Sequence, residues 1–333
     1  MTKAIALFSG GLDSMLAARL VMEQGVETLA LQFITPFFGY KYKGREDEAA
    51  LEFERMYGIR GIVIDVSKDY IAMLRNPKYG YGKNFNPCID CKVFMMRRAK
   101  EVMEREGADM VVSGEVLGQR PMSQRRDAMR IIERDSGLDG YLLRPLCAKH
   151  MKPTLPEERG LIDRERLMDI SGRSRKVQME MAERMGIKEY QTPAGGCQLT
   201  DPILSQRVRK LVMEREDVEV EDVRILAVGR HFDLPGARLY VGRNRDENER
   251  LGSLARDGDV IIKVRTRPGP LAVLRGDVTD EVMELAARVT ARYCDKAGLE
   301  TFEVGFKAQG GGEGSLTVSP MDEASVEELR TVY

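Results

Sequence analysis

The sequence predicts an α/β fold with a parallel sheet flanked by helices, followed by a smaller α+β domain. Through the first half of the 333 residues, short apolar runs alternate with amphipathic stretches of helical spacing, a pattern typical of parallel sheets covered on both faces. From about residue 224 the pattern changes to short, closely spaced β runs. The length also favours two domains over one. We place them at residues 1–205 and 215–333, with the boundary between 203 and 220.

The expected elements of the first domain alternate in kind. We expect strands at 4–8, 28–34, 61–66, 110–113 and 141–146, longer helices at 14–24, 45–57, 92–107 and 123–135, and short helices at 164–170 and 175–186. The second domain is expected to hold strands at 223–228, 237–241, 260–264, 271–274, 302–306 and 315–318, with a helix at 280–297. Ligands of parallel sheets bind beyond the carboxyl ends of the strands, so we look there for a site.

The composition is that of an ordinary globular protein, with 43% hydrophobic and 32% charged residues. No apolar run approaches the roughly 18 residues that a membrane helix needs, and the apolar start shows no signal cleavage site. We therefore expect a cytoplasmic protein. The net charge is −1, but residues 118–210 hold 19 Lys or Arg against 13 Asp or Glu. This basic middle region indicates either an anionic ligand or a set of solvated helices.

Residues 9–14 read S-G-G-L-D-S and link the first expected strand to a helix. The glycines permit a tight turn, and its N–H groups together with the helix N-terminus form an anion site. Ser9 and Ser14 can add hydroxyl groups. Asp13 would repel a phosphate unless Mg²⁺ lies between them, since oxygen ligands suit that ion. The alternative is an ordinary strand–turn–helix in which Asp13 interacts with the helix dipole.

The five cysteines are an odd number, which argues against a disulfide scaffold. Cys88 and Cys91 form a C-x-x-C at an expected helix start, where a lowered pKa favours the metal-binding thiolate. Cys197 lies in a Gly-Gly-Cys loop. Three thiolates would leave one iron of a 4Fe–4S cluster open to an external ligand. Zinc, a cluster-free persulfide and disulfide chemistry, and a merely structural Cys197 stay open as alternatives; Cys147 and Cys294 are expected in the core.

The S-G-G-L-D-S string resembles the PP-loop ATP pyrophosphatases, whose fold is adenine nucleotide alpha hydrolase-like. With the three cysteines, residues 1–200 resemble the cluster-dependent tRNA uridine thiolases of the ThiI and MnmA type. This resemblance implies that ATP is cleaved between its α and β phosphates, that AMP passes to a uridine carbonyl, and that sulfur replaces oxygen 2 or 4. It implies catalytic roles for Asp13, Cys88, Cys91 and Cys197, with the cysteines holding the cluster.

The same resemblance implies an ATP and Mg²⁺ site formed by Ser9, Gly10, Gly11, Asp13, Ser14, Gln32, Phe33, Gly114 and Glu115. It further implies tRNA as the partner, and hydrosulfide or a cysteine desulfurase as the sulfur donor. We expect no THUMP-like domain ahead of the turn at residues 9–14, the phosphate turn, unlike in full-length 4-thiouridine synthases. A PP-loop ligase or amidotransferase using ammonia, and a non-enzymatic RNA-binding factor, are the competing interpretations.

Basic segments accompany both domains. Residues 119–126 and 172–176 carry arginines suited to phosphate, with Lys149 and Lys152 as weaker candidates; solvated helix starts are the alternative. In the second domain, residues 229–232, 242–248 and 265–270 place arginines between short strands, and this region resembles the RNA-binding module of the NFACT group. That resemblance implies a sequence-independent grip on RNA phosphates. A plain structural or dimerising domain, and hence a homodimer, stays open.

Overall fold

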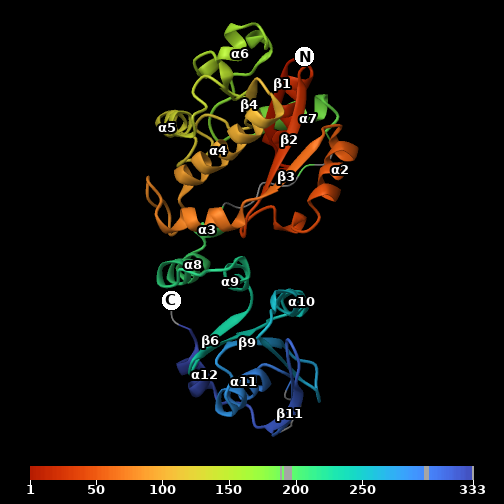
Figure 1. Ribbon diagram of the computed structural model, residues 1–333, viewed down its shortest axis with the longest axis vertical. Helices are drawn as coiled ribbons and strands as arrows, with labels where there is room; N and C mark the ends of the chain where they lie inside the picture. Colours follow the sequence, from red (N-terminus) through yellow and green to blue (C-terminus); the bar gives the residue numbers. More distant parts are fainter. Residues whose placement is uncertain (188–189, 191–196, 296–299, 332–333) are drawn as a thin grey trace. The chain divides into compact units, whose positions relative to one another are not determined.

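The computed structural model describes residues 1–187, 190, 197–295 and 300–331. It divides into two compact units, Met1–Glu216 and Asp217–Tyr333 (Figure 1). The expected fold class is confirmed, because the first unit contains a parallel sheet flanked by helices and the second contains a separate antiparallel sheet with helices.

The first unit follows the expected alternation of strands and helices. Its strands are β1 (Lys3–Leu7), β2 (Glu27–Ile34), β3 (Gly61–Asp65), β4 (Met110–Val112) and β5 (Leu142–Leu143). Its α-helices are α1 (Leu12–Met22), α2 (Glu46–Tyr57), α3 (Ser67–Arg75), α4 (Cys88–Glu106), α5 (Arg126–Ser136), α6 (Leu155–Glu158), α7 (Lys176–Arg184) and α8 (Pro202–Glu214). Short 3-10 turns lie at η1 (Tyr40–Tyr42), η2 (Ala148–His150), η3 (Arg164–Arg166) and η4 (Gln198–Thr200).

The described strands of this unit form one parallel sheet in the order β3-β2-β1-β4-β5. Side chains alternate across it. Ala4 and Ala6 of β1 join a core with α1, α2 and α7, and Ile5, which is fully buried, points to the opposite face, where α4 contacts β1. The strand order reverses between β1 and β4, so the carboxyl ends of these strands flank the position where such sheets bind ligands.

The structure corrects several boundaries in this unit. The fifth strand is only two residues long, Leu142–Leu143, and the expected helix at 164–170 is the single 3-10 turn η3. Helix α4 begins at Cys88, four residues before the expected start, so both cysteines of the C-x-x-C lie in its first turns. Helices α3, α6 and α8 had no counterpart in the sequence analysis.

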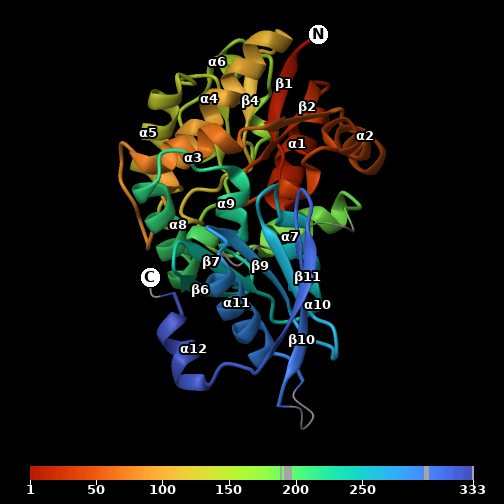
Figure 2. The same cartoon turned by 60° about the horizontal axis from the view of Figure 1, so that its bottom comes forward.

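The second unit is built on an antiparallel sheet. Its strands are β6 (Arg230–Leu234), β7 (Ala237–Val241), β8 (Val260–Val264), β9 (Leu271–Gly276), β10 (Phe302–Ala308) and β11 (Glu313–Val318), and its helices are α9 (Val220–Ile225), α10 (Arg245–Leu254), α11 (Asp280–Arg292) and α12 (Glu323–Leu329). Among the described residues the order is β11-β10-β8-β9-β7-β6. Helix α11 packs on all six of these strands (Figure 2), and α10 contacts β9.

The expected strand at 223–228 is wrong, because the chain forms helix α9 there. A capping box explains the outcome: the Glu219 side chain accepts from the N3 backbone, and the Asp222 side chain accepts from the N-cap backbone. The arginine-bearing segments taken for turns are also more regular than expected, since Arg230 opens β6 and Arg245 opens α10. None of the described helices is both long and apolar enough to cross a lipid bilayer.

Candidate functional site

The turn between β1 and α1 is held by two serine hydroxyls. Ser14 Oγ donates to the Gly11 carbonyl at 2.8 Å, and it lies 3.2 Å from Ser9 Oγ. The Ser9 N–H donates to Ser14 Oγ at 3.3 Å. Gly10 has a φ of 71°, a conformation that favours glycine. The N-cap Gly11 has no side chain to cap α1, which leaves the start of this helix suited to an anion.

Asp13 lies in the first turn of α1 with its carboxylate partly buried. Its Oδ2 accepts from Gln119 Nε2 at 3.1 Å and from Arg175 Nη2 at 3.5 Å. Its Oδ1 is buried and has no hydrogen-bond partner among the described residues. Buried acceptors are normally satisfied, and Mg²⁺ takes oxygen ligands. This unpaired carboxylate oxygen beside an anion-binding turn therefore fits a magnesium ion accompanying a nucleotide.

Gly114, directly after Ser113 at the end of β4, packs against the start of α1. A Cβ at this position would lie 2.5 Å from the carbonyl carbon and oxygen of Asp13, and 2.7 Å from the Ser14 nitrogen. Real side chains do not approach backbone atoms this closely. Glycine is therefore required for β4 and the phosphate turn to meet, at the point where the strand order reverses.

Gln32 and Phe33 lie near the end of β2 and are both buried. The register pairs β2 with β1 only as far as Leu31, so both residues extend past the last ladder pair with β1. Gln32 Nε2 donates to the Phe33 carbonyl at 2.7 Å. A Cβ on Gly39 would lie 2.2 Å from that same carbonyl oxygen. Because the Gln32 side chain already donates a hydrogen bond to the Phe33 carbonyl, an adenine contact at these residues stays a prediction.

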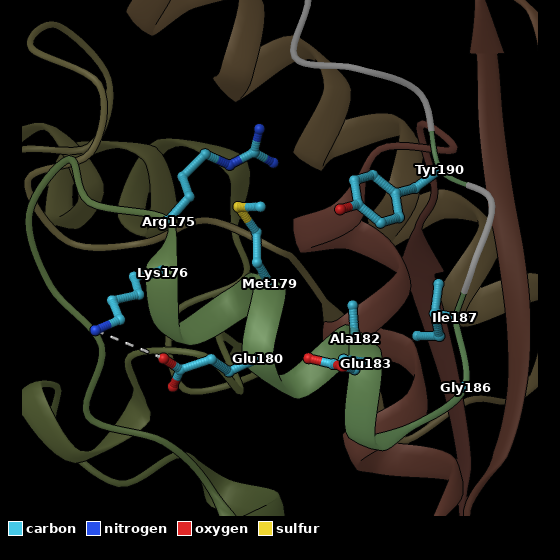
Figure 3. Close-up of a pocket in the computed structure, with 9 residues that line it drawn as sticks. All are labelled: Arg175, Lys176, Met179, Glu180, Ala182, Glu183, Gly186, Ile187 and Tyr190. Carbon is cyan, nitrogen blue, oxygen red and sulfur yellow. Dashed lines mark ion pairs between the residues drawn. The ribbon is translucent and has the colours of Figure 1, made fainter.

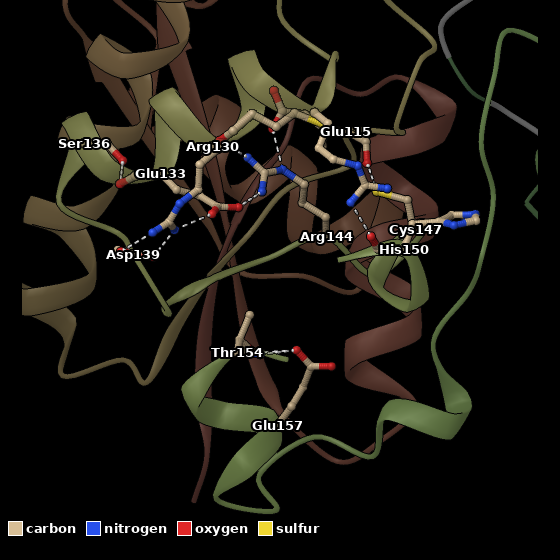
Figure 4. Close-up of polar contacts among 12 residues, drawn as sticks. Glu115, Arg130, Glu133, Ser136, Asp139, Arg144, Cys147, His150, Thr154 and Glu157 are labelled. Atoms are coloured by element: carbon tan, nitrogen blue, oxygen red, sulfur yellow. Dashed lines mark hydrogen bonds and ion pairs between the residues drawn. The ribbon is translucent and has the colours of Figure 1, made fainter. Parts of the chain in front are cut away.

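Glu115 belongs to a buried ion cluster (Figure 4). Arg144 Nε donates to its Oε2 at 3.0 Å, and Lys92 Nζ of α4 lies 3.3 Å from its Oε1. Arg144 also pairs with Glu133 of α5. Burial opposes ionisation, but the charges of Lys92 and Arg144 lower the pKa of Glu115 below its ordinary value. The carboxylate thus joins the end of β4 to α4, and nucleotide binding by Glu115 stays a prediction.

The three predicted cysteines lie in two segments that hydrogen bonds connect, and their role as a joint ligand set stays a prediction. Asn84 Nδ2, in the loop before α4, donates to the Thr200 carbonyl at 2.8 Å, and Thr200 Oγ1 donates to the Cys197 carbonyl at 2.6 Å. These bonds tie the Cys197 turn to the segment that leads into Cys88. The thiols of Cys88, Cys91 and Cys197 interact electrostatically with one another. All are free thiols in the structure.

Cys88, Cys91 and Cys197 offer three sulfur atoms as possible metal ligands. In the part of the chain that the structure describes, no three His, Cys, Asp or Glu side chains surround a single metal position. A 4Fe–4S cluster requires a wider spacing of its ligands, because its thiolates are bound around a four-iron core rather than to one ion. Three neighbouring thiols contributed by a helix start and a separate turn fit that demand.

Tyr70 of α3 donates its hydroxyl to Cys91 Sγ at 3.3 Å. Burial raises the pKa of Cys91 to about 11, although the Tyr70 hydrogen bond and the Lys92 charge act in the opposite direction. Burial likewise raises the pKa of Cys197. The expectation that the helix start lowers the pKa of Cys91 is therefore wrong, because desolvation outweighs the helix N-terminus at this buried position.

Arg175 connects the phosphate turn to a cavity of about 670 Å³ along α7. Figure 3 shows Arg175 and Met179 projecting from α7, with Tyr190 on the other side. Lys176 pairs with Glu180 across one helical turn at 3.9 Å. Since Arg175 also contacts Asp13, this cavity adjoins the phosphate turn.

The other basic candidates are mostly engaged with neighbours. Arg120 interacts electrostatically with Cys197, Arg125 pairs with Asp127, and Arg126 donates to the His150 carbonyl at 2.8 Å. Lys149 pairs with Glu165 at 3.3 Å, and Lys152 interacts with Asp139. In the second unit, Arg243 pairs with the buried Glu247, whereas exposed pairs join Arg245 to Glu249 and Arg265 to Glu303. Exposed pairs contribute little to stability, so these arginines can exchange a carboxylate for a phosphate at small cost.

Three residues of this site were missed by sequence reasoning: Tyr70, Asn84 and Asp90. Asp90, inside the C-x-x-C, accepts from the backbone N–H groups of Lys78 and Tyr79 at 2.8 and 2.9 Å, so it shapes the loop before α4. An acidic residue at an expected helix start was a usable signal for Asp90. Tyr70 and Asn84 carry no such local signal.

Comparisons with known proteins match each unit separately. Residues 1–152 match the family model described as Thiamine biosynthesis protein (ThiI), and residues 229–330 match the NFACT protein RNA binding domain. A probable tRNA sulfurtransferase of Thermococcus kodakarensis is 30% identical over 171 residues, covering 51% of this chain and 40% of that protein. Another from Methanosarcina mazei is 34% identical over 125 residues, covering 35% and 29%. The chain thus covers less than half the length of these relatives.

Among solved structures, a 4-thiouridine synthetase–RNA complex with bound ATP is 22% identical, covers 68% of this chain and 52% of that chain, and has a TM-score of 0.38. The fold and the turn define a parallel α/β unit with a glycine turn suited to an anion, followed by an antiparallel α+β unit. The resemblance drawn from the sequence is confirmed: the first unit is similar to the PP-loop proteins of the ThiI type, and the second to the NFACT RNA-binding domain.

Proposed function

We propose that this chain is an ATP-dependent tRNA sulfurtransferase that replaces a carbonyl oxygen of uridine with sulfur, at position 2 or 4. The ThiI match, the relatives named as probable tRNA sulfurtransferases, and the NFACT match support it. The observation that supports this proposal most directly is that the end of β4 contacts both the phosphate turn and the helix that contains Cys88 and Cys91. There Gly114 abuts the phosphate turn, and Glu115 pairs with Lys92, the residue after Cys91.

The proposed reaction balances without an oxidant or reductant. The uridine carbonyl oxygen attacks the α-phosphorus of ATP, and pyrophosphate leaves. Free hydrosulfide, whose sulfur is already at the sulfide level, then adds at the activated carbon and loses its proton. The C–O bond breaks, and the former carbonyl oxygen departs with AMP. AMP is a far better leaving group than the oxygen alone, which is why ATP is consumed.

The phosphate turn has the groups that the first half-reaction needs. Ser9, Gly10, Gly11 and Ser14 would bind the pyrophosphate through N–H and hydroxyl groups at the start of α1. The unpaired Oδ1 of Asp13 would hold Mg²⁺ on the phosphates. These groups are fixed before the nucleotide arrives, so they need little reorganisation to stabilise the charge that develops on pyrophosphate.

We assign Cys88, Cys91 and Cys197 to a 4Fe–4S cluster. When bound through three cysteines, such a cluster offers one open iron for an external sulfur ligand. The protein contributes the geometry: α4 presents two of the thiols, and the bond from Asn84 to Thr200 holds the turn that presents the third. Arginines of the second unit would contact the tRNA backbone.

The test uses protein purified without oxygen, with Cys88→Ala, Cys91→Ala and Cys197→Ala, and with Cys294→Ala of the second unit as the control. Mass spectrometry of tRNA nucleosides measures thiouridine, and calorimetry measures ATP binding. We expect each of the first three variants to lose thiolation and iron but to retain ATP binding. Active, iron-free wild-type protein would instead support the persulfide and disulfide route. Ammonia-dependent turnover without thiouridine would support a ligase and overturn the proposal.

A further inference from the structure

A buried tyrosine hydroxyl contacts one thiol of the sulfur site, which consists of Cys88, Cys91 and Cys197. Tyr70 is 1% exposed, and its hydroxyl donates to Cys91 Sγ at 3.3 Å. It also interacts electrostatically with Cys88 and Cys197. Because the side chain is enclosed, water cannot replace it as a hydrogen-bond donor to Cys91. The proposed roles of the site use only the thiols and leave this hydroxyl without a function.

The direction of the hydroxyl is set by the packing of its ring. Phe37 and Phe38, which follow the end of β2, lie 5.8 and 5.9 Å from the Tyr70 ring, measured between ring centroids. Phe94 of α4 packs edge-on at 6.0 Å. Three aromatic neighbours restrict the tyrosine to the position in which its oxygen faces Cys91.

We propose that Tyr70 is a positioning residue of the sulfur site, whose hydroxyl donates a hydrogen bond to the Cys91 sulfur of a bound 4Fe–4S cluster and raises the reduction potential of that cluster. The inference rests on the proposed function. Its physical basis is charge: reduction adds an electron to the cluster, and a donor aimed at a ligating sulfur stabilises the more negative state. Hydrogen bonds to the sulfurs are among the factors that set such potentials.

The experiment compares Tyr70→Phe with a matched control, Tyr81→Phe. Tyr81 lies in the loop before α4, and its hydroxyl donates to the Leu74 carbonyl rather than to sulfur. Wild type and both variants are purified without oxygen and reconstituted with ferrous iron and sulfide. Their iron content is measured, and their midpoint potentials are determined by redox titration followed by electron paramagnetic resonance. We expect Tyr70→Phe to shift the potential to more negative values and Tyr81→Phe to leave it at the wild-type value.

A second substitution separates hydrogen bonding from packing. Replacing Tyr70 by 3-fluorotyrosine keeps the ring and makes the phenol more acidic, so it donates a stronger hydrogen bond and should shift the potential to more positive values. General loosening of the site cannot produce opposite shifts in the two variants. The fluorinated protein also carries the test if Tyr70→Phe does not fold.

Each outcome bears on a different claim. A wild-type cluster whose potential is unchanged by both Tyr70 substitutions overturns the role of Tyr70 and leaves the proposed function intact. Wild-type protein that binds no iron after reconstitution removes the cluster from the proposed function, and this inference falls with it. Equal shifts in Tyr70→Phe and Tyr81→Phe would trace the effect to packing and also overturn the inference.

Discussion

Substituting Gly114 by alanine should disable the phosphate turn without unfolding the protein. The added Cβ would lie 2.5 Å from the Asp13 backbone, about 0.9 Å short of the 3.4 Å at which ordinary contacts begin. Either the end of β4 or the start of α1 must move by about that distance. Overpacking of this kind costs about 1–3 kcal/mol of stability, and a displacement of about 1 Å in a catalytic group can cost about 100-fold in rate.

Pyrophosphate release in the presence of tRNA and sulfide measures the rate, and thermal unfolding measures stability. We expect Gly114→Ala to lose about 100-fold in rate and to remain folded. The control is Gly252→Ala in α10, where the added Cβ would meet only Leu271 Cδ1 at 3.6 Å, an ordinary contact. That variant should keep the wild-type rate and gain up to about 1 kcal/mol. Wild-type rates in folded Gly114→Ala would refute the close approach of β4 to the turn.

Three further predictions concern the supports of the site. Arg144→Met removes one of the two cations that pair with the buried Glu115 and leaves Lys92 in place, so it should cost about 3 kcal/mol in urea unfolding. Arg125→Met, which breaks an exposed pair, should cost under about 1 kcal/mol. Although burial opposes ionisation, ion pairing lowers the folded-state pKa of Glu115 below 4.5. Its contribution to the free energy of unfolding is therefore complete above about pH 4.5 and is lost as the pH falls through the folded-state pKa. Between pH 7 and pH 4, wild type should lose more stability than Glu115→Gln. Asn84→Gly tolerates the φ of 57° but removes the bond to the Thr200 carbonyl, so Cys197 should react faster with a thiol-alkylating reagent than in wild type.

The parts of the fold that were predictable are those specified by short stretches of chain. An apolar run followed by S-G-G-L-D-S fixed both β1 and the turn after it, because strand, glycine turn and helix start are contiguous there. The parallel sheet followed from the alternation of strands and helices, since parallel neighbours need a crossover between them. The strand order, with β4 next to β1, was beyond this reasoning because no local pattern specifies which strands pair.

Residues 223–228 show why a short apolar run is ambiguous. The sequence V-R-I-L-A-V satisfies a buried strand as well as a buried helix, and periodicity does not separate them. The deciding feature lies upstream, in the capping box formed by Glu219 and Asp222. A search for capping residues ahead of each apolar run would have favoured the helix.

The candidate site was predictable only where its residues sit in motifs. The cysteines were found through their spacing, but Tyr70 donates to Cys91 from a different helix, 21 positions away. Asp13 likewise meets Gln119 across 106 positions and Arg175 across 162 positions. A single sequence does not show such pairings, because each partner is an ordinary polar residue until the fold places it.

The end of β4 links the two halves of the proposed chemistry, and this link can be tested by comparing variants. Gly114 touches the phosphate turn through its backbone, and the next residue, Glu115, holds Lys92 of the helix that carries Cys91. A shift of the end of β4 of about 0.9 Å should therefore reach both regions, because Gly114 and the buried Glu115 are consecutive residues in a close-packed interior. We expect Gly114→Ala to weaken ATP binding and to shift the reduction potential of the proposed cluster together, whereas Tyr70→Phe changes that potential and leaves ATP binding at the wild-type value. If Gly114→Ala altered ATP binding with no change at the sulfur site, the two halves would be mechanically independent.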